Sequence, residues 1–354
     1  MKTVASRTGI ITCFILVLLS SCQKNSLSVP ADALSETGRN AMNDRGGKED
    51  RLLLKSIEFS DDYSFGGPYI VTNQFEYNGR NLFEKNNFSS GQVQLYKYNR
   101  MGETEKIINT NISGSNNGYY RFYYGYSHDR NRPVKAELNY GDMIDAAADW
   151  YYFDYDRKGN ITKLQVIIGG TKLCCEIRYK YDCRDNLIQM DFYFPDANAG
   201  TSARQLLQNT SARKMVNQFI PVEKLDDTHF HPSGESTFSN VPLVLAATTY
   251  IKHDNKINPL YQQNGILFYL TNYQLLNVQD YASCMSRSNP LEYRIVYNPG
   301  TDSQSEDVQT FTYTYNQYNY PLTQEFYQEE PGFWQRHTKT FSYMEKHECV
   351  SSIN

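Results

Sequence analysis

The sequence predicts an all-β fold, a long antiparallel meander of hairpins curled into an open or partly closed barrel-like sheet with one or two short helical insertions. Aromatic residues are abundant, with 30 Tyr and 18 Phe among 354 residues. They recur at alternating positions, the spacing that places side chains on one face of a strand. The aromatic pairs are followed by Asp or Asn and then by Gly or Asn, residue types that form tight turns.

The clearest copy of this repeat runs from Phe153 to Ile161, with the sequence FDYDRKGNI. Its aromatic residues suit a half-buried strand, its Asp and Gly suit a turn, and Ile161 begins the next strand. In the successive copies the second aromatic residue stands at positions 77, 98, 124, 155, 181, 315 and 343. Apart from the interval between 181 and 315, the spacing fits two strands and two turns per copy.

Three segments interrupt this rhythm. Residues Ala197 to Phe219 and Met143 to Trp150 are expected to form short helices between strands. Residues 298 to 308 are rich in Pro, Gly, Ser, Asp and Gln and are expected to form a loop.

The first 21 residues have the pattern of a secretory signal peptide, with Lys2 and Arg7 before a short apolar stretch. They lead into Leu-Ser-Ser-Cys22, a bacterial lipobox, which predicts cleavage before Cys22 and lipidation of that residue. The alternatives are an ordinary signal peptide and an uncleaved core helix. Residues 22–50 have the polar composition of a flexible tether, and residues 51–354 are expected to form a single repeat-built β domain.

Charge and cysteine content limit the partners. The formal charge is −4, and removal of Lys2 and Arg7 with the signal makes it −6 (−4 minus 2). Because the charges are interspersed, neither nucleic acid nor an anionic lipid surface is an expected partner.

Seven Cys are present, of which Cys13 leaves with the signal and Cys22 is lipidated. Five cysteines remain, including Cys175 and Cys183. These two would either form a disulfide across neighbouring strands or stay as thiols, and in the second case most of the five thiols would be buried.

The lipobox, the tether and the repeats together resemble an uncharacterised family of Bacteroidota lipoproteins. Its members carry YD-like repeats and a domain of unknown function with a porin-like fold. The resemblance covers most of residues 55 to 345, including the segments Tyr250 to Leu260 and Tyr313 to Leu322. It implies a curled sheet and no established activity. Lys97, Glu176, Arg178 and Lys180 on the second faces of their strands indicate a water-facing surface, since lipid-facing strands would be apolar there.

The sequence contains few candidate catalytic or metal-binding residues. Asp154-x-Asp156-x-x-Gly159 begins like a calcium loop, but Lys158 and Gln165 replace two ligands, so turn formation is favoured. His229 and His231 would share one face of a strand but lack a third metal ligand, and Pro232 and Gly234 favour an exposed loop there. We expect no metal and no cofactor. Trp334 lies outside the repeat and is the best candidate for an exposed aromatic ligand contact.

These observations favour a protein anchored in the cell envelope by lipid alone, in the outer membrane as the family resemblance implies, with its leaflet undetermined. It would be non-enzymatic, a binding or assembly surface for a glycan, a peptide or an envelope partner, with Trp334, His229 and His231 as candidate ligand contacts. One alternative is a hydrolase acting on envelope or dietary polymers, with carboxylates assembled by the fold. The other is a purely structural accessory lipoprotein.

Overall fold

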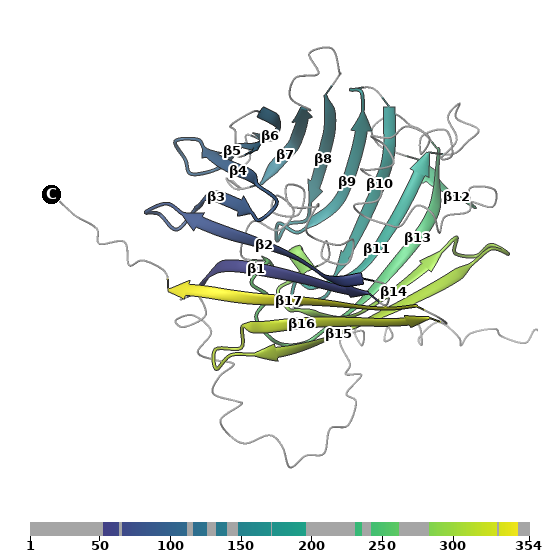
Figure 1. Ribbon diagram of the computed structural model, residues 1–354. Coiled ribbons are helices and arrows are strands. Elements are labelled where there is room, and N and C mark those ends of the chain that lie inside the picture. The colour runs from purple at the N-terminus through teal and green to yellow at the C-terminus, as the bar shows by residue number, and fades with distance from the viewer. Residues whose placement is uncertain are drawn as a thin grey trace, which may run out of the picture. The chain divides into compact units, whose positions relative to one another are not determined.

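The computed structural model describes residues 52–63, 66–111, 116–125, 132–139, 148–170, 172–195, 231–235, 242–261, 283–330 and 333–345 (Figure 1). They form seventeen strands, with the following bounds: β1 Leu52–Tyr63, β2 Gly66–Tyr77, β3 Phe83–Phe88, β4 Gln92–Tyr98, β5 Thr104–Asn111, β6 Asn116–Tyr124, β7 Pro133–Asn139, β8 Asp149–Tyr155, β9 Ile161–Ile168, β10 Lys172–Tyr181, β11 Leu187–Pro195, β12 His231–Glu235, β13 Pro242–His253, β14 Pro290–Tyr297, β15 Ser305–Tyr315, β16 Pro321–Glu330 and β17 Phe333–Glu345.

Sixteen of these strands close into an antiparallel barrel. Strands β1 to β11 pair in chain order, β11 pairs with β13, and β13 to β17 continue in order. The barrel closes where β17 pairs with β1, from Leu52 opposite Glu345 to Tyr63 opposite Gln335, and Figure 1 shows the two strands side by side. The seventeenth strand, β12, pairs with the first residues of β13. The predicted all-β meander is therefore confirmed, and its sheet is closed completely.

The inner wall of the barrel is apolar and buried. One cluster of buried side chains takes at least one residue from every barrel strand, including Ile57, Tyr120, Tyr151 and Tyr293. Successive residues along each strand alternate between this cluster and the outside, as the pleat requires. Sixteen-stranded porins surround a water-filled channel with polar residues. Here the inner wall is instead the hydrophobic core.

The outer wall carries many charged side chains, beside one small apolar cluster of Ile167, Leu173, Tyr193 and Leu243. Cross-strand ion pairs join Lys163 Nζ to Asp154 Oδ2 at 2.5 Å, Lys252 Nζ to Glu292 Oε1 at 2.7 Å and Arg294 Nη2 to Glu306 Oε2 at 2.7 Å. Lipid-facing strands would carry an apolar band, so these outer positions fit water. Glu176 also faces outward but is buried, with its carboxylate bonded to Gln165 and Arg178. In the part of the chain that is described, no helix is long and apolar enough to cross a membrane.

Two expectations about irregular segments need correction. Strand β8 begins at Asp149, so the last two residues of the helix expected over 143–150 are strand; residues 143–147 lie outside the described residues, as do 197–219. Asp149 is held there because its carboxylate accepts the N–H of Gly169 at 2.9 Å. Strand β15 begins at Ser305, so the loop expected over 298–308 ends earlier. Its strand residues pair with β14 from Tyr297 to Arg294.

The described cysteines are free thiols. Cys174, Cys175 and Cys284 are buried, and burial together with the neighbouring Cys174 raises the pKa of the Cys175 thiol. Cys183 is exposed in the turn after β10. Cys175 and Cys183 are therefore not on neighbouring strands, and the three buried thiols act as small apolar side chains.

Candidate functional site

The most regular polar feature of the barrel is one of its two rims. Neighbouring strands run in opposite directions, so successive connections alternate between the rims. The connections β2–β3, β4–β5, β8–β9, β10–β11, β13–β14 and β15–β16 therefore lie at the same rim, together with the start of β1 and the end of β17. Each of these six connections opens with Asp or Asn. We call this edge the Asx rim; its turns comprise residues 78–82, 99–103, 156–160, 182–186, 254–258 and 316–320.

Five of these turns share one geometry. In the turn 156–160, the Oδ1 atom of Asp156 accepts the N–H groups of Lys158 and Asn160, both at 2.9 Å. The N–H of Asp156 donates to the carbonyl of Asn160, and that of Gly159 donates to the carbonyl of Asp156. The fourth residue has a positive φ, 92° at Gly159 and 63° at Asp185. The same bonds recur in the turns that begin at Asn78, Asn99, Asp182 and Asn316.

The sixth turn is the same motif opened by a long insertion. The Oδ1 atom of Asp254 accepts the N–H of Lys256 at 2.9 Å and the N–H of Asn289 at 3.0 Å. Asn289 thus takes the place of the fifth turn residue although it lies 35 positions along the chain. The second carboxylate oxygen accepts the amide of Asn289 and the hydroxyl of Tyr315. This carboxylate therefore joins three segments of the rim.

Tyrosine hydroxyls tie most hairpins of the rim to the one before. The Tyr155 hydroxyl donates to the carbonyl of Pro133 at 2.8 Å, from the end of β8 to the start of β7. Burial raises the pKa of Tyr155, so the hydroxyl keeps its proton. Equivalent bonds run from Tyr77 to Leu54, Tyr98 to Phe83, Tyr124 to Thr104, Tyr313 to Pro290 and Tyr343 to Pro321. The second aromatic residue of most repeat copies thus fastens adjacent hairpins where the chain itself does not connect them.

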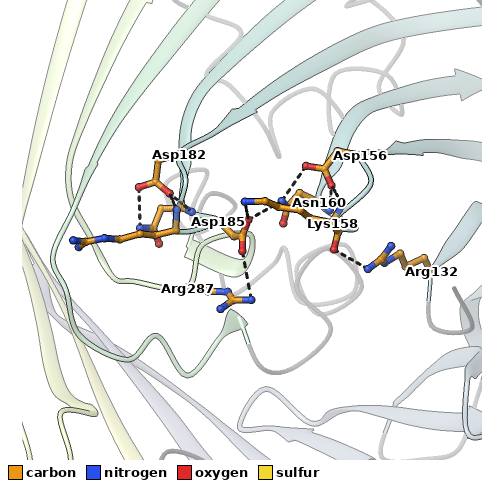
Figure 2. Close-up of polar contacts among 9 residues, drawn as sticks. Arg132, Asp156, Lys158, Asn160, Asp182, Asp185 and Arg287 are labelled. Carbon is orange, nitrogen blue, oxygen red and sulfur yellow. Dashed lines mark hydrogen bonds and ion pairs between the residues drawn. The ribbon is translucent and has the colours of Figure 1, made fainter. Parts of the chain in front are cut away.

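Asp185 is the centre of a polar cluster between neighbouring turns (Figure 2). Its Oδ1 atom accepts the Lys158 ammonium at 2.9 Å and the Asn160 amide at 3.2 Å, and its Oδ2 atom lies 3.4 Å from Arg287 Nη2. Arg132 reaches the other side of this turn, where its guanidinium donates to the backbone carbonyl of Lys158 at 2.9 Å. The turns from β6–β7 to β13–β14 are thereby linked side by side.

The acidic groups of this cluster are held as carboxylates. Partial burial raises the pKa of Asp156, but hydrogen bonds from Asn160, Gly159 and Lys158 outweigh it and leave the pKa below its usual range. The pKa of Asp185 is likewise lowered, because the contacts with Lys158, Asn160 and Arg287 outweigh its partial burial. These charges stabilise turns and are accessible to water, so each ion pair contributes little to folding.

A serine and a histidine meet at the edge of the rim, but their surroundings do not suit nucleophilic catalysis. His253 Nε2 lies 3.0 Å from Ser286 Oγ. Burial lowers the pKa of His253 to about 4, although Asp182 and Asp254 oppose the shift. Ser286 is fully buried, and its oxygen also accepts the N–H of Leu187 at 3.1 Å. A nucleophile must reach its substrate, so this pair is a structural link between β13 and β11.

The calcium interpretation of Asp154 and Asp156 finds no support in the geometry. The Oδ1 atom of Asp156 accepts two N–H groups and its Oδ2 atom accepts the Asn160 amide at 3.1 Å. Asp154 lies on the outer wall, bonded to Lys163. Among the described residues, no group of three or more His, Cys, Asp or Glu is arranged to hold a metal ion.

The candidate ligand contacts expected from the sequence are not gathered in one place. Trp334 lies on β17 opposite Glu329 and is 38% exposed. His231 is the first residue of β12, opposite Leu245, so residues 231–235 form a strand where a loop was expected. His229 and Cys22 lie outside the described residues.

The sequence did not point to the neighbour of Trp334. Tyr327 is 55% exposed and lies opposite Arg336. It is therefore the diagonal neighbour of Trp334, about 7 Å away. Both face outward, because they alternate with Phe326 and His337 of the inner wall, whose rings are stacked at 5.6 Å. Two exposed aromatic side chains thus form a small platform on the outer wall, away from the Asx rim.

Comparison with known proteins adds little beyond the fold. No protein-family model and no curated protein sequence matches the chain. A solved porin-like protein from Bacteroides uniformis aligns over 82% of this chain and 98% of its own, with 10% identity and a TM-score of 0.47. Two solved structures of TcdB2-TccC3 assemblies align at 11% and 13% identity with TM-scores of 0.26 and 0.24, and the chain covers only 15% and 10% of their lengths.

Proposed function

We propose that this protein is a non-enzymatic lipoprotein of the bacterial cell envelope, held by acylated Cys22 and a tether of residues 22–50. The lipobox that ends in Cys22, followed by the polar tether, carries this proposal. The pairing of Leu52 with Glu345 places the start of the barrel at the Asx rim, so the tether joins the barrel at that rim. A flexible tether of this length spans about 30 Å. The barrel then presents its outer wall to partners. The Bacteroidota lipoproteins with YD-like repeats, which the sequence resembles, would do the same in the outer membrane.

The polar groups of the rim support a binding role more than a hydrolytic one. The side chains of Asp156, Asp182 and Asp254 each accept two backbone N–H groups, which leaves their carboxylates committed to turn structure. A hydrolase needs titratable groups that face a substrate. Ser286, which lies beside His253, is buried and does not face a substrate.

Replacing Cys22 with alanine tests the anchor. We expect the wild-type protein in the membrane fraction and the Cys22→Ala protein in the soluble fraction, because the acyl chains supply the membrane affinity. Metabolic labelling with a fatty acid should mark the wild type and not the Cys22→Ala protein. Cys183→Ala is the matched control, since it removes an exposed thiol outside the lipobox and should leave fractionation unchanged. A Cys22→Ala protein that stays with membranes after a high-salt wash would contradict the anchor.

The aromatic platform of Tyr327 and Trp334 is the proposed ligand surface, and a glycan is the proposed ligand. Exposed Tyr and Trp rings offer an apolar face and a polar edge, which suits sugar rings. Arg336, paired with Glu325, supplies charged hydrogen-bonding groups beside them. A peptide that binds by strand addition needs an open sheet edge. Each of the sixteen barrel strands is already paired on both sides, which favours the glycan.

A glycan array probed with the labelled barrel tests this platform. We expect Trp334→Ala and Tyr327→Ala each to weaken the strongest glycan signal by about tenfold, since the loss of one stacking aromatic costs about 1 kcal/mol or more. Tyr318→Ala is the control, because Tyr318 is 50% exposed but lies in a rim turn. Equal binding by all three variants would remove the platform from the proposal.

A further inference from the structure

The exposed charges in the six turns of the Asx rim all have the same sign. Within the six described turns, the charged side chains classed as exposed are Arg80, Arg100, Arg157, Lys158 and Arg184. The acidic residues of these turns are less exposed, since Asp156, Asp182, Asp185 and Asp254 are half-buried and Glu103 is buried. Asp156, Asp182 and Asp254 accept backbone N–H groups, and Asp185 is paired with Lys158. The tips of the turns are therefore basic.

This basic surface exists only in the folded barrel. Along the chain the five residues are spread over about a hundred positions in a protein of net charge −4, which is why the sequence suggested no anionic partner. Closure brings their hairpins to one rim, where Arg287 joins them through its contact with Asp185. Exposed acids also lie close to the rim, on the strands and not at the turn tips, at Glu76, Glu84, Glu105, Asp154 and Glu345.

Two exposed side chains at the same tips have the character of the membrane interface. Met101 is 67% exposed in the turn after β4, and Tyr318 is 50% exposed in the turn after β15. Apolar and aromatic side chains among basic residues favour the boundary between lipid headgroups and acyl chains. The rim therefore offers both contacts that a peripheral membrane surface uses.

We propose that the Asx rim faces the membrane and binds anionic lipid headgroups. The inference deepens the proposed function and rests on it, because the tether from lipidated Cys22 enters the barrel at Leu52 on this rim. Each Lys or Arg near an anionic surface adds attraction that salt screens within about 10 Å. The acyl chains hold the protein on the membrane, and the basic turns set its orientation, with the platform of Tyr327 and Trp334 away from the lipid.

Vesicle co-sedimentation separates the rim from the anchor. The chain from residue 22 with Cys22→Ala carries no lipid and is mixed with vesicles of phosphatidylcholine, with or without phosphatidylglycerol. We expect binding only with phosphatidylglycerol and loss of it at high salt. The triple variant Arg80→Gln, Arg100→Gln, Arg184→Gln should bind about a hundredfold more weakly. The control Arg121→Gln, Arg294→Gln, Arg336→Gln removes the same charge from exposed outer-wall positions further from the rim turns and should change binding much less.

A fluorescent label measures the orientation directly. Cys183 is exposed in a rim turn, so an environment-sensitive dye on this thiol, with Cys349→Ser in the same chain, should shift to the blue on anionic vesicles. The same dye on Asp302→Cys, in the β14–β15 turn of the opposite rim and with Cys183→Ser, should not shift. Equal loss of binding in both triple variants, or a shift only at position 302, would overturn the orientation. The anchor would survive either result if Cys22→Ala still releases the protein.

Discussion

Replacing Tyr120 with alanine is expected to lower the free energy of unfolding by about 4 kcal/mol, the usual cost of removing a large buried aromatic ring. Tyr120 is 1% exposed on β6. Its ring centroid lies 6.4 Å from that of Tyr151 and 6.5 Å from that of Phe122. The change removes the ring from a wall in which neighbouring side chains are also buried, so the cavity left behind adds to the lost burial. Urea unfolding followed by circular dichroism measures the loss.

The matched control is Tyr69→Ala. Tyr69 also lies on a barrel strand but is 63% exposed, and its replacement should change stability by less than about 0.5 kcal/mol. The comparison decides how the barrel is filled. A barrel of sixteen strands with a water-filled channel would tolerate both changes almost equally. Similar values for Tyr120→Ala and Tyr69→Ala would therefore contradict the packed inner wall.

The hairpins could be predicted because their determinants are local. In the copy from Phe153 to Ile161, alternation sets the strand face, Asp156 forms the turn, and Gly159 supplies the positive φ, all within nine residues. Closure of the sheet could not be predicted in this way. It depends on pairing between β1 and β17, which are far apart in sequence and carry no local mark of being neighbours.

The misassigned segments show tertiary contacts overriding local preference. The Ala-rich run before Trp150 favours a helix. Asp149 and Trp150 nevertheless join β8, where Trp150 packs against Tyr123 at 5.9 Å and against the Lys135 ammonium at 4.6 Å. Residues 305–308 looked like a loop because outer-wall positions are polar. Glu306 is one of them, and it pairs with Arg294 on β14.

The candidate site likewise contains features that local sequence predicts and features that depend on pairing between strands. The sequence identified Trp334 as the aromatic residue outside the repeat, but not its diagonal neighbour Tyr327, because register between β16 and β17 is set by the whole hairpin. The basic rim does have a signal in the sequence. A Lys or Arg stands one or two positions after the Asx residue in five of the six turns, at Arg80, Arg100, Arg157, Arg184 and Lys256.

Acid should weaken the fold through His253 before it protonates the rim carboxylates. Burial lowers the pKa of His253 in the folded protein to about 4 from an ordinary 6.5. Above pH 6.5 the imidazole is neutral in both states and contributes no pH dependence. As the pH falls from about 6.5 to about 4, the unfolded chain binds a proton that the folded protein refuses, so stability is lost. The full loss is about 3 kcal/mol, and about 2 kcal/mol has been lost at about pH 5.

His253→Gln isolates this contribution, because glutamine is polar but does not titrate. The variant should be less sensitive to acid than the wild type, with a stability difference between the two proteins that shifts by about 2 kcal/mol in favour of the variant from about pH 7.5 to about pH 5. The shift cannot come from Asp156 or Asp185, because their lowered pKa values place their titration at more acidic pH and both proteins contain them. NMR titration of the imidazole provides the direct reading. A stability difference that stays constant over this range, or a His253 pKa near 6.5, would mean that the ring is hydrated and that the contact with Ser286 does not seal this edge of the rim.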